Sequence, residues 1–325
     1  MDHLVKEPQP SSNIVQQDTP PFFVLMLLLV AVLIGLLIGN LTVLIVSNLM
    51  GHDLQKLLLS VRQDSPLEIR NMLRTINLVS HFTTFTLSSV ILALFLYKKK
   101  MLSYFKLDKM PSINNLGFGV LFIMASFPLA IFIMWINQQI PLPEWAVTME
   151  ESASGMLKSV LNMQSPVELL FNLLVVAVLP AVGEELLFRG VVQQQIEKST
   201  KNGILAIWIT ATVFSAIHLQ FEGFFPRLLL GAILGYLFYW TKNLWVPILA
   251  HFVFNGTQIV GKYFYQDQVS IENSVDFEKI PWLPGIIGIL IMLFIGNYIR
   301  QHNASKAEQQ ELVQNEPLDK IDEQS

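Results

Sequence analysis

The chain of 325 residues is 52% hydrophobic and only 14% charged, with a mean hydropathy of +0.49. A soluble domain carries about 25% charged residues, so this composition indicates a polytopic membrane protein. A net charge of −4 without a basic block argues against a nucleic-acid binder, and the absence of cysteine excludes disulfides, Cys-ligated zinc and a thiol nucleophile.

Hydropathy predicts an all-α membrane bundle of about eight transmembrane helices. The first 20 residues hold one lysine and three acidic residues. A cleavable signal peptide would have a positive n-region, so the apolar run that follows is interpreted as an uncleaved first helix. The expected spans are 22–47, 75–97, 114–136, 166–188, 203–220, 224–240, 244–261 and 283–300.

The segments between the spans are predicted from their composition. Residues 51–74 mix charges with leucines and are expected to form a helical loop, and residues 145–161 are expected to form an amphipathic surface helix. The expected organisation is a polar N-terminal segment (1–21), N-terminal membrane helices and loops (22–165), a catalytic core (166–261), a last loop and transmembrane helix (262–300) and a disordered polar tail (301–325).

The distribution of lysine and arginine between the loops predicts the orientation in the membrane. The strongest lysine cluster lies between residues 98 and 109, and a cytoplasmic position for it puts both termini in the cytoplasm. This orientation leaves twelve basic loop residues inside and eight outside. Four of those eight lie together and count against it: Lys56, Arg62, Arg70 and Arg74.

Two adjacent glutamates follow an apolar run that is expected to be embedded in the membrane. A carboxylate in a bilayer costs on the order of 3 kcal/mol by insertion scales, so a chain that places Glu184 and Glu185 side by side there has a use for them. Glu185 and Arg189 are four residues apart, share a helix face and are expected to form an ion pair. Glu184 points about 100° away and has no obvious local partner, which makes it the better candidate for chemistry.

Polar side chains on later spans complete the candidate site. His218 lies near the end of the fifth expected span, and His251 and Asn255 share one face of the seventh. Counting residues from the turns that precede and follow these helices predicts that His218 reaches the depth of Glu184. The same count places His251 about two turns shallower and Asn255 closer to Glu184.

A carboxylate beside two imidazoles and an amide suits the activation of water. Glu184 could act as a general base, while a histidine orients the water and Asn255 or a protonated histidine holds an oxyanion. Glu184, His218 and His251 could instead bind Zn²⁺. The shallower position expected for His251 favours the metal-free alternative. His81, in the second span, is interpreted as an interhelical hydrogen-bond partner rather than a catalyst.

The polar patterns follow one another along the chain as Glu184-Glu185-x-x-x-Arg189, Phe214-x-x-x-His218 and His251-x-x-x-Asn255. In this order they resemble the three motifs of the CPBP family of intramembrane proteases. This is the CAAX-processing and bacteriocin-processing group, also called Abi, which is related to the Ras-converting CAAX endopeptidase. The resemblance covers about residues 166–260.

The resemblance implies a role for each motif residue. Glu184 would activate water with His218. Glu185 and Arg189 would shape the site, while the last motif would polarise the scissile carbonyl or complete a metal site. The family is commonly named as metalloproteases, and a metal-free glutamate mechanism is also proposed for it. Zinc is therefore an open alternative.

The function implied by the resemblance is that of a peptidase in the cytoplasmic (inner) membrane of a bacterium. Its partners would be the lipid bilayer and a membrane-embedded or membrane-anchored substrate, either a CAAX-type prenyl protein or a bacteriocin-like peptide, and no nucleic acid. Two other functions stay open. The lack of repeats and broken helix pairs argues against an ion-coupled transporter, and the intact acid, histidines and asparagine argue against a non-catalytic scaffold.

Overall fold

The computed structural model of the protein describes residues 19–51, 53–265 and 282–314. All regular structure within these residues is helical, which confirms the expected all-α membrane bundle. The elements are α1 (Pro21–Leu49), α2 (Leu54–Ser60), α3 (Leu67–His81), η2 (Phe82–Leu87), α4 (Ser88–Tyr97), η3 (Lys98–Lys100), α5 (Met101–Tyr104), α6 (Ile113–Ala125), α7 (Phe127–Gln138), α8 (Glu144–Val160), α9 (Pro166–Asn172), η4 (Leu173–Val178), α10 (Leu179–Leu187), η5 (Phe188–Gln193), α11 (Gln194–Thr200), α12 (Gly203–Ala216), α13 (Phe224–Thr241), α14 (Trp245–Tyr265) and α16 (Trp282–Gln314).

Each of the eight expected spans corresponds to helix. In the described part of the chain, six helical segments are long and apolar enough to cross a membrane: Pro21–Leu49, Leu67–Tyr104, Ile113–Gln138, Pro166–Thr200, Phe224–Thr241 and Trp282–Ser305. The other two expected spans correspond to α12, a shorter apolar helix, and α14, which has 21 residues. The membrane bundle is therefore clear from length and composition, while the number of eight crossings stays a prediction.

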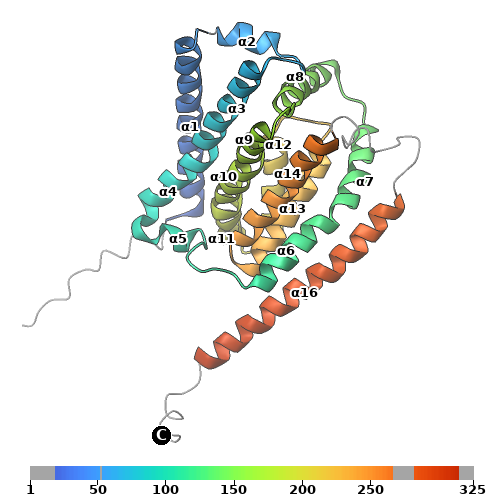
Figure 1. Cartoon of the computed structure of the whole chain (residues 1–325). Helices are drawn as coiled ribbons and strands as arrows, with labels where there is room; N and C mark the ends of the chain where they lie inside the picture. Colours follow the sequence, from blue (N-terminus) through green and yellow to red (C-terminus); the bar gives the residue numbers. More distant parts are fainter. Residues whose placement is uncertain (1–18, 52, 266–281, 315–325) are drawn as a thin grey trace, which may run out of the picture.

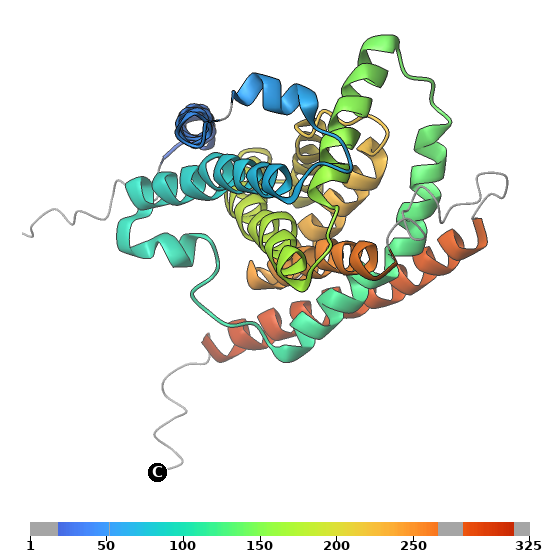
Figure 2. The same cartoon turned by 45° about the horizontal axis from the view of Figure 1, so that its top comes forward.

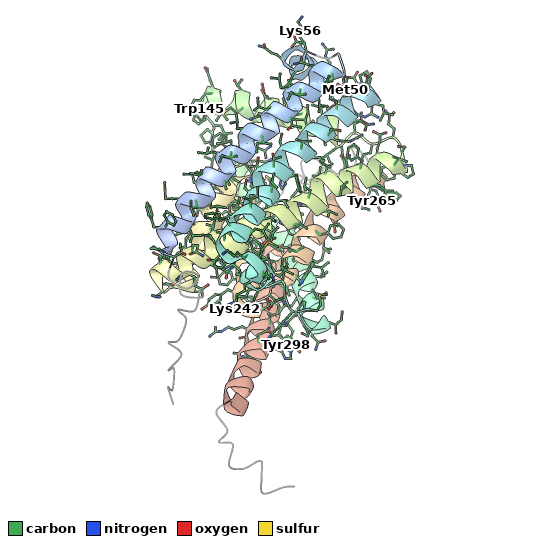
Figure 3. All side chains as sticks on the ribbon, turned by 90° about the vertical axis from the view of Figure 1, so that its left-hand side faces the viewer. Met50, Lys56, Trp145, Lys242, Tyr265 and Tyr298 are labelled. Carbon is green, nitrogen blue, oxygen red and sulfur yellow. The ribbon has the colours of Figure 1, made fainter. Side chains whose placement is uncertain are left out.

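The helices form one bundle that the chain traverses repeatedly from end to end (Figure 1). α1, α3 and α4 lie on one flank, and α16 lies along α6 and α7 on another (Figure 2). Met50, Lys56 and Trp145 lie toward one end of the bundle, and Lys242 and Tyr298 toward the other (Figure 3). The segment from α9 to α11 contacts α3, η2, α12, α13 and α14, and its residues 183–191 are buried inside the bundle.

The segment 51–74 is largely helical, as expected, but its second half belongs to α3 rather than to a loop. It contains α2, which Asp53 caps by accepting a backbone hydrogen bond, and the first turns of α3, which begins at Leu67. Arg70 and Arg74 therefore lie on a helical segment long and apolar enough to cross a membrane, where they are 3% and 0% exposed. They are buried side chains rather than loop charges, so two of the four residues that oppose the predicted orientation do not count against it.

The C-terminal helix also differs from the prediction. α16 continues to Gln314, past the expected end of the span at residue 300, so residues 301–314 are helical rather than disordered. Alanine, glutamine, glutamate and lysine dominate this stretch and are good helix formers, which explains the continuation. Residues 315–325 and 1–18 lie outside the described part. The expected amphipathic helix at 145–161 corresponds to α8.

Candidate active site

One long helical segment, from α9 to α11, carries both glutamates. Ser165 begins it by accepting a hydrogen bond from the backbone N–H of Glu168 (3.3 Å), and Pro166 occupies the first turn, where its missing N–H has no helical partner to lose. π-helical turns η4 and η5 lie on either side of α10. Such turns occur often at functional sites. α10 places Glu184 and Glu185 inside the protein, 5% and 0% exposed.

The predicted ion pair between Glu185 and Arg189 is confirmed. Nη1 of Arg189 donates to Oε1 of Glu185 at 2.7 Å, and both side chains are fully buried. Nη2 of Arg189 donates to the backbone carbonyl of Gly231 on α13 (2.6 Å), and its guanidinium lies 5.2 Å from the ring centre of Phe214. A Cβ atom at Gly231 would lie 3.0 Å from Cα of Ala211, so glycine allows the close approach of α12 and α13.

His251 contacts both glutamates. Its Nδ1 lies 3.0 Å from Oε1 of Glu185, and its Nε2 lies 3.9 Å from Oε2 of Glu184. Because an ionised Glu185 paired with Arg189 can only accept hydrogen bonds, Nδ1 of His251 is the donor. In a neutral imidazole the other nitrogen then carries a lone pair, so Nε2 presents an acceptor toward Glu184.

Glu184 has a partner that sequence reasoning did not assign to the site. Nε2 of His81, at the end of α3, donates to its Oε1 at 3.0 Å. The interhelical hydrogen bond expected of His81 is thus present, but it ends on the carboxylate expected to do chemistry. The sequence offered one signal, a titratable residue in an apolar span, and gave no indication of its partner 103 residues away.

His218 is held by its own helix. Its Nδ1 donates to the backbone carbonyl of Phe214 (2.8 Å), which leaves Nε2 available, and it lies within electrostatic range of Glu184. The buried ring of Phe214 makes edge contacts with His218 and His251, with ring centres 5.2 and 6.2 Å apart. Phe214 therefore packs against both imidazoles.

Asn255 supports the backbone of the helix that carries the glutamates. Its Nδ2 donates to the carbonyl of Val176 in η4 at 3.1 Å. Pro180, four residues after Val176, has no N–H to offer this carbonyl, and Asn255 supplies a donor in its place. The oxyanion role expected for Asn255 stays a prediction.

The predicted depths of the α14 residues are wrong. His251 reaches both glutamates, whereas Asn255 binds Val176, eight residues before Glu184. Residue counting assumed that the turns after α11 and α13 lie at the same level. Lys242, in the turn after α13, pairs with Glu197, which lies about one turn before the end of α11. The turn at Lys242 therefore lies nearer to the glutamates than the residue count assumed, and His251 lies correspondingly deeper.

The three predicted metal ligands are not grouped as a metal site. Each keeps one free donor atom, because the hydrogen bonds of Glu184, His218 and His251 use Oε1, Nδ1 and Nδ1. Among the described residues, however, no group of three His, Asp or Glu side chains is arranged to hold a metal ion. A catalytic zinc site has three protein ligands, so the predicted set of Glu184, His218 and His251 does not fit a zinc ion in this arrangement.

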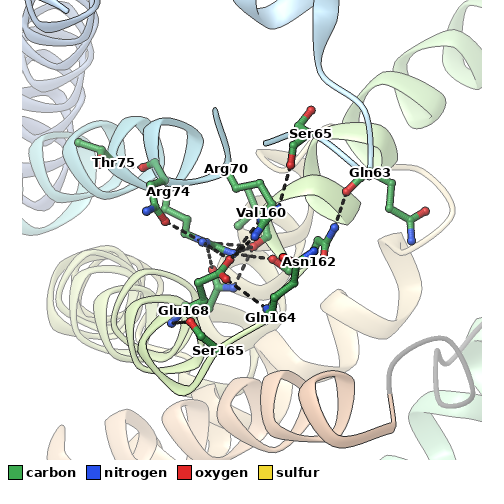
Figure 4. A network of polar contacts seen from close by, with 12 residues as sticks. Gln63, Ser65, Arg70, Arg74, Thr75, Val160, Asn162, Gln164, Ser165 and Glu168 are labelled. Carbon is green, nitrogen blue, oxygen red and sulfur yellow. Dashed lines mark hydrogen bonds and ion pairs between the residues drawn. The ribbon is translucent and has the colours of Figure 1, made fainter. Parts of the chain in front are cut away.

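A second buried polar network joins α3 to α9 and to the end of α8 (Figure 4). Arg70 donates to Oε2 of Glu168 through Nε and Nη2 (3.2 and 2.9 Å), and Arg74 donates to the same oxygen through Nη1 (2.9 Å). Nη2 of Arg74 also donates to the backbone carbonyls of Val160 (2.9 Å) and Asn162 (2.7 Å). These partners explain why two arginines are tolerated on a membrane-spanning helix.

The comparisons with known proteins concern this same part of the chain. Residues 166–257 match the family described as type II CAAX prenyl endopeptidase Rce1-like. This match confirms the resemblance found in the sequence, and it covers Glu184, Glu185, Arg189, His218, His251 and Asn255. His81 and the arginines of α3 lie outside the matched segment.

Two relatives come from Bacillus subtilis strain 168. One is an uncharacterized protein, YpbD, which is 26% identical over 134 residues, and the other is YdiL, named as a putative membrane peptidase, which is 24% identical over 147 residues. The alignments cover 40% and 45% of this chain and 64% and 58% of the relatives, less than two thirds of either. No solved structure matches the chain.

Proposed function

We propose that the protein is an intramembrane endopeptidase in which Glu184 takes a proton from the water that attacks a peptide bond. The observation that carries this proposal is the unequal use of the two Glu184 oxygens. Oε1 accepts a hydrogen bond from His81, whereas Oε2 faces the acceptor nitrogen Nε2 of His251 across 3.9 Å. The match to the Rce1-like family and the similarity to YdiL support a peptidase.

Two acceptors that face each other suit a water molecule as the nucleophile. Water has two hydrogens, one for Oε2 of Glu184 and one for Nε2 of His251, and its oxygen then points a lone pair at the substrate carbonyl. Glu184 takes the first hydrogen as a proton while the oxygen bonds to the carbonyl carbon. The carbon–nitrogen bond then breaks, and Glu184 returns the proton to the leaving amine, which gives one carboxylic acid and one amine.

The remaining groups hold the reacting atoms in place. Glu185 accepts from Nδ1 of His251, which fixes the tautomer of the ring, and pairs with Arg189. His218 in its cationic form, with Nδ1–H bonded to Phe214, donates from Nε2–H to the carbonyl oxygen as negative charge develops on it. Burial of these side chains keeps bulk water out, which strengthens each electrostatic contact.

The substrate class follows from the location of the site. Glu184 is buried on a segment long and apolar enough to cross a membrane, so the scissile bond belongs to a membrane-embedded or membrane-anchored peptide. A CAAX-type prenyl protein and a bacteriocin-like peptide both fit this description. The protein would act in the cytoplasmic membrane of a bacterium, with both termini in the cytoplasm.

The proposal is tested by comparing membrane peptides from cells that carry the wild type or Glu184→Gln. The amide keeps the volume of the side chain but cannot take the proton. Quantitative proteomics should find peptides that are cut in the wild type and accumulate uncut in the variant. Identical peptide patterns, with the variant inserted and folded, would show that Glu184 is not the base and would favour a transporter or scaffold.

A further inference from the structure

His81 lies outside the segment that resembles the peptidase family, yet it contacts the central carboxylate. Its Nε2 donates to Oε1 of Glu184 at 3.0 Å, and its side chain is 16% exposed, so the contact is largely shielded from solvent. An ionised carboxylate only accepts hydrogen bonds, which fixes Nε2 as the donor. A hydrogen bond to a buried charged group is among the stronger contacts in a protein.

The backbone of α10 is shaped to admit His81. Gly183, which directly precedes Glu184, faces α3 and η2. A Cβ atom at this position would lie 3.2 Å from Cε1 of His81 and 2.6 Å from Oγ1 of Thr86, the second of which is too short for any real contact. Glycine is therefore the residue that allows η2 and the imidazole to approach the glutamate this closely.

Packing fixes the direction of the imidazole ring. The ring of His81 stacks on Phe85, one turn later, with centres 4.5 Å apart and planes inclined by 27°. Its Nδ1 is buried and has no hydrogen-bond partner among the residues that the structure describes. Stacking rather than a second hydrogen bond thus keeps Nε2 pointed at Glu184.

The helix that carries His81 is anchored against the helix that carries Glu184. The contacts Arg70–Glu168 and His81–Glu184 follow in the same order along both helices, so the two helices run in the same direction. Arg74 precedes His81 by seven residues, about two turns, and so lies on the same face. The buried arginine network therefore sets the height at which His81 meets Glu184.

We propose that His81 is a positioning residue of the active site, which holds Oε1 of Glu184 so that Oε2 faces His251 and the attacking water. This assignment rests on the proposed function. Without the hydrogen bond, the carboxylate is free to rotate about its last side-chain bond, and Oε2 no longer stays aligned with Nε2 of His251.

The test uses two amide substitutions of nearly equal polarity. In His81→Gln, the amide nitrogen reaches the place of Nε2 and still donates to Glu184. In His81→Asn, the side chain is one methylene shorter and the donor falls short. We expect His81→Gln to keep most of the wild-type turnover and His81→Asn to lose about 10- to 100-fold in kcat with little change in KM, the scale of one charge-assisted hydrogen bond.

The substrate for this assay is a quenched fluorescent peptide that spans a cut site identified by comparing wild type with Glu184→Gln. Equal kcat values for wild type, His81→Gln and His81→Asn would overturn the role of His81. Equal losses of kcat in both amide variants, with wild-type melting temperatures, would also overturn it. The donor that His81→Gln keeps would then not be what sustains turnover. An absence of any peptide that depends on Glu184 would instead overturn the proposed function itself.

Discussion

Two buried carboxylate clusters lie on the same long helical segment, and they differ in their ratio of acidic to basic side chains. In the first, Glu168 receives hydrogen bonds from two arginines. In the second, Glu184 and Glu185 share a single arginine and two histidines. With neutral histidines, the first cluster has one excess positive charge and the second has one excess negative charge.

The clusters differ further in how completely their hydrogen bonds are formed. Both oxygens of Glu168 accept hydrogen bonds, and every guanidinium nitrogen of Arg70 and Arg74 donates at least one. In the second cluster, Oε2 of Glu185 and Nε of Arg189 have no hydrogen-bond partner among the described residues. A fully bonded buried network rigidifies a protein. The contrast supports the proposal that the second cluster carries the chemistry, while the first stabilises the fold.

The sharpest test of this contrast applies one substitution to both clusters. Glu184→Gln should lower kcat by roughly 10²–10⁴-fold, the usual scale for loss of a general base, with little change in thermal stability. Glu168→Gln, on the same helical segment, should lower the melting temperature and reduce kcat per folded molecule far less than Glu184→Gln does, because Glu168 reaches the reactive cluster only through the arginine network that aligns His81. Wild-type turnover in Glu184→Gln, or a folded and inactive Glu168→Gln, would contradict the division.

A second test breaks the stabilising cluster directly. Arg74→Met removes the donor to Glu168, to the end of α8 and to Asn172, and leaves polar groups buried without partners. Breaking a buried ion pair in this way should lower the free energy of unfolding by about 3–5 kcal/mol. Arg62→Met is the control, because this exposed arginine lies just before α3 and should change stability little. Equal stability of the two variants would show that the network is dispensable.

Local spacing decided which parts of these clusters could be predicted from the sequence. The ion pair between Glu185 and Arg189 needs only one helix and a separation of four residues, so it could be predicted and was confirmed. The pairs Arg70–Glu168 and His81–Glu184 join residues 98 and 103 positions apart and depend on how two helices pack. Nothing in a local pattern encodes that packing.

Hydropathy also misplaced the start of α3, because the ion pairs that neutralise its arginines form only in the folded protein. Arg70 and Arg74 lower the apolar character of the first turns of α3, so these turns were predicted as part of a loop. Glu168 and backbone carbonyls neutralise and bind the arginines only in the folded protein. The predicted depth of His251 was likewise wrong, because residue counts along single helices do not include how far one hairpin is shifted against the other.

A third test measures coupling inside the reactive cluster. Glu185→Ala and Arg189→Ala should each lower stability, since each leaves one buried charge unpaired, and the double variant should be less destabilised than the sum. The coupling energy in a double-mutant cycle should be roughly 0.5–3 kcal/mol. A cycle of Glu185→Ala with Arg62→Ala serves as the control and should give additive effects. Additive effects in the first cycle would show that the ion pair contributes nothing to stability.

The smallest expected effect is the response to a metal chelator. It tests whether the excess negative charge of the reactive cluster binds a metal cation or accepts a proton from water. Glu184, His218 and His251 would have to turn three free donor atoms toward one point to hold zinc. Each of the three keeps one free donor atom, but among the described residues they are not grouped as a metal site requires.

We therefore expect peptide cleavage by the purified protein to survive chelation without a measurable change in kcat, and zinc content to be far below one ion per chain. The control is Glu184→Gln, which should be inactive with or without added zinc, because the missing group is the base itself. Stoichiometric zinc in the active protein, lost together with activity in His251→Ala, would contradict this expectation. In that case the gap of 3.9 Å between His251 and Glu184 would be a metal position, and the cluster would hold a cation in place of the second arginine that Glu168 has.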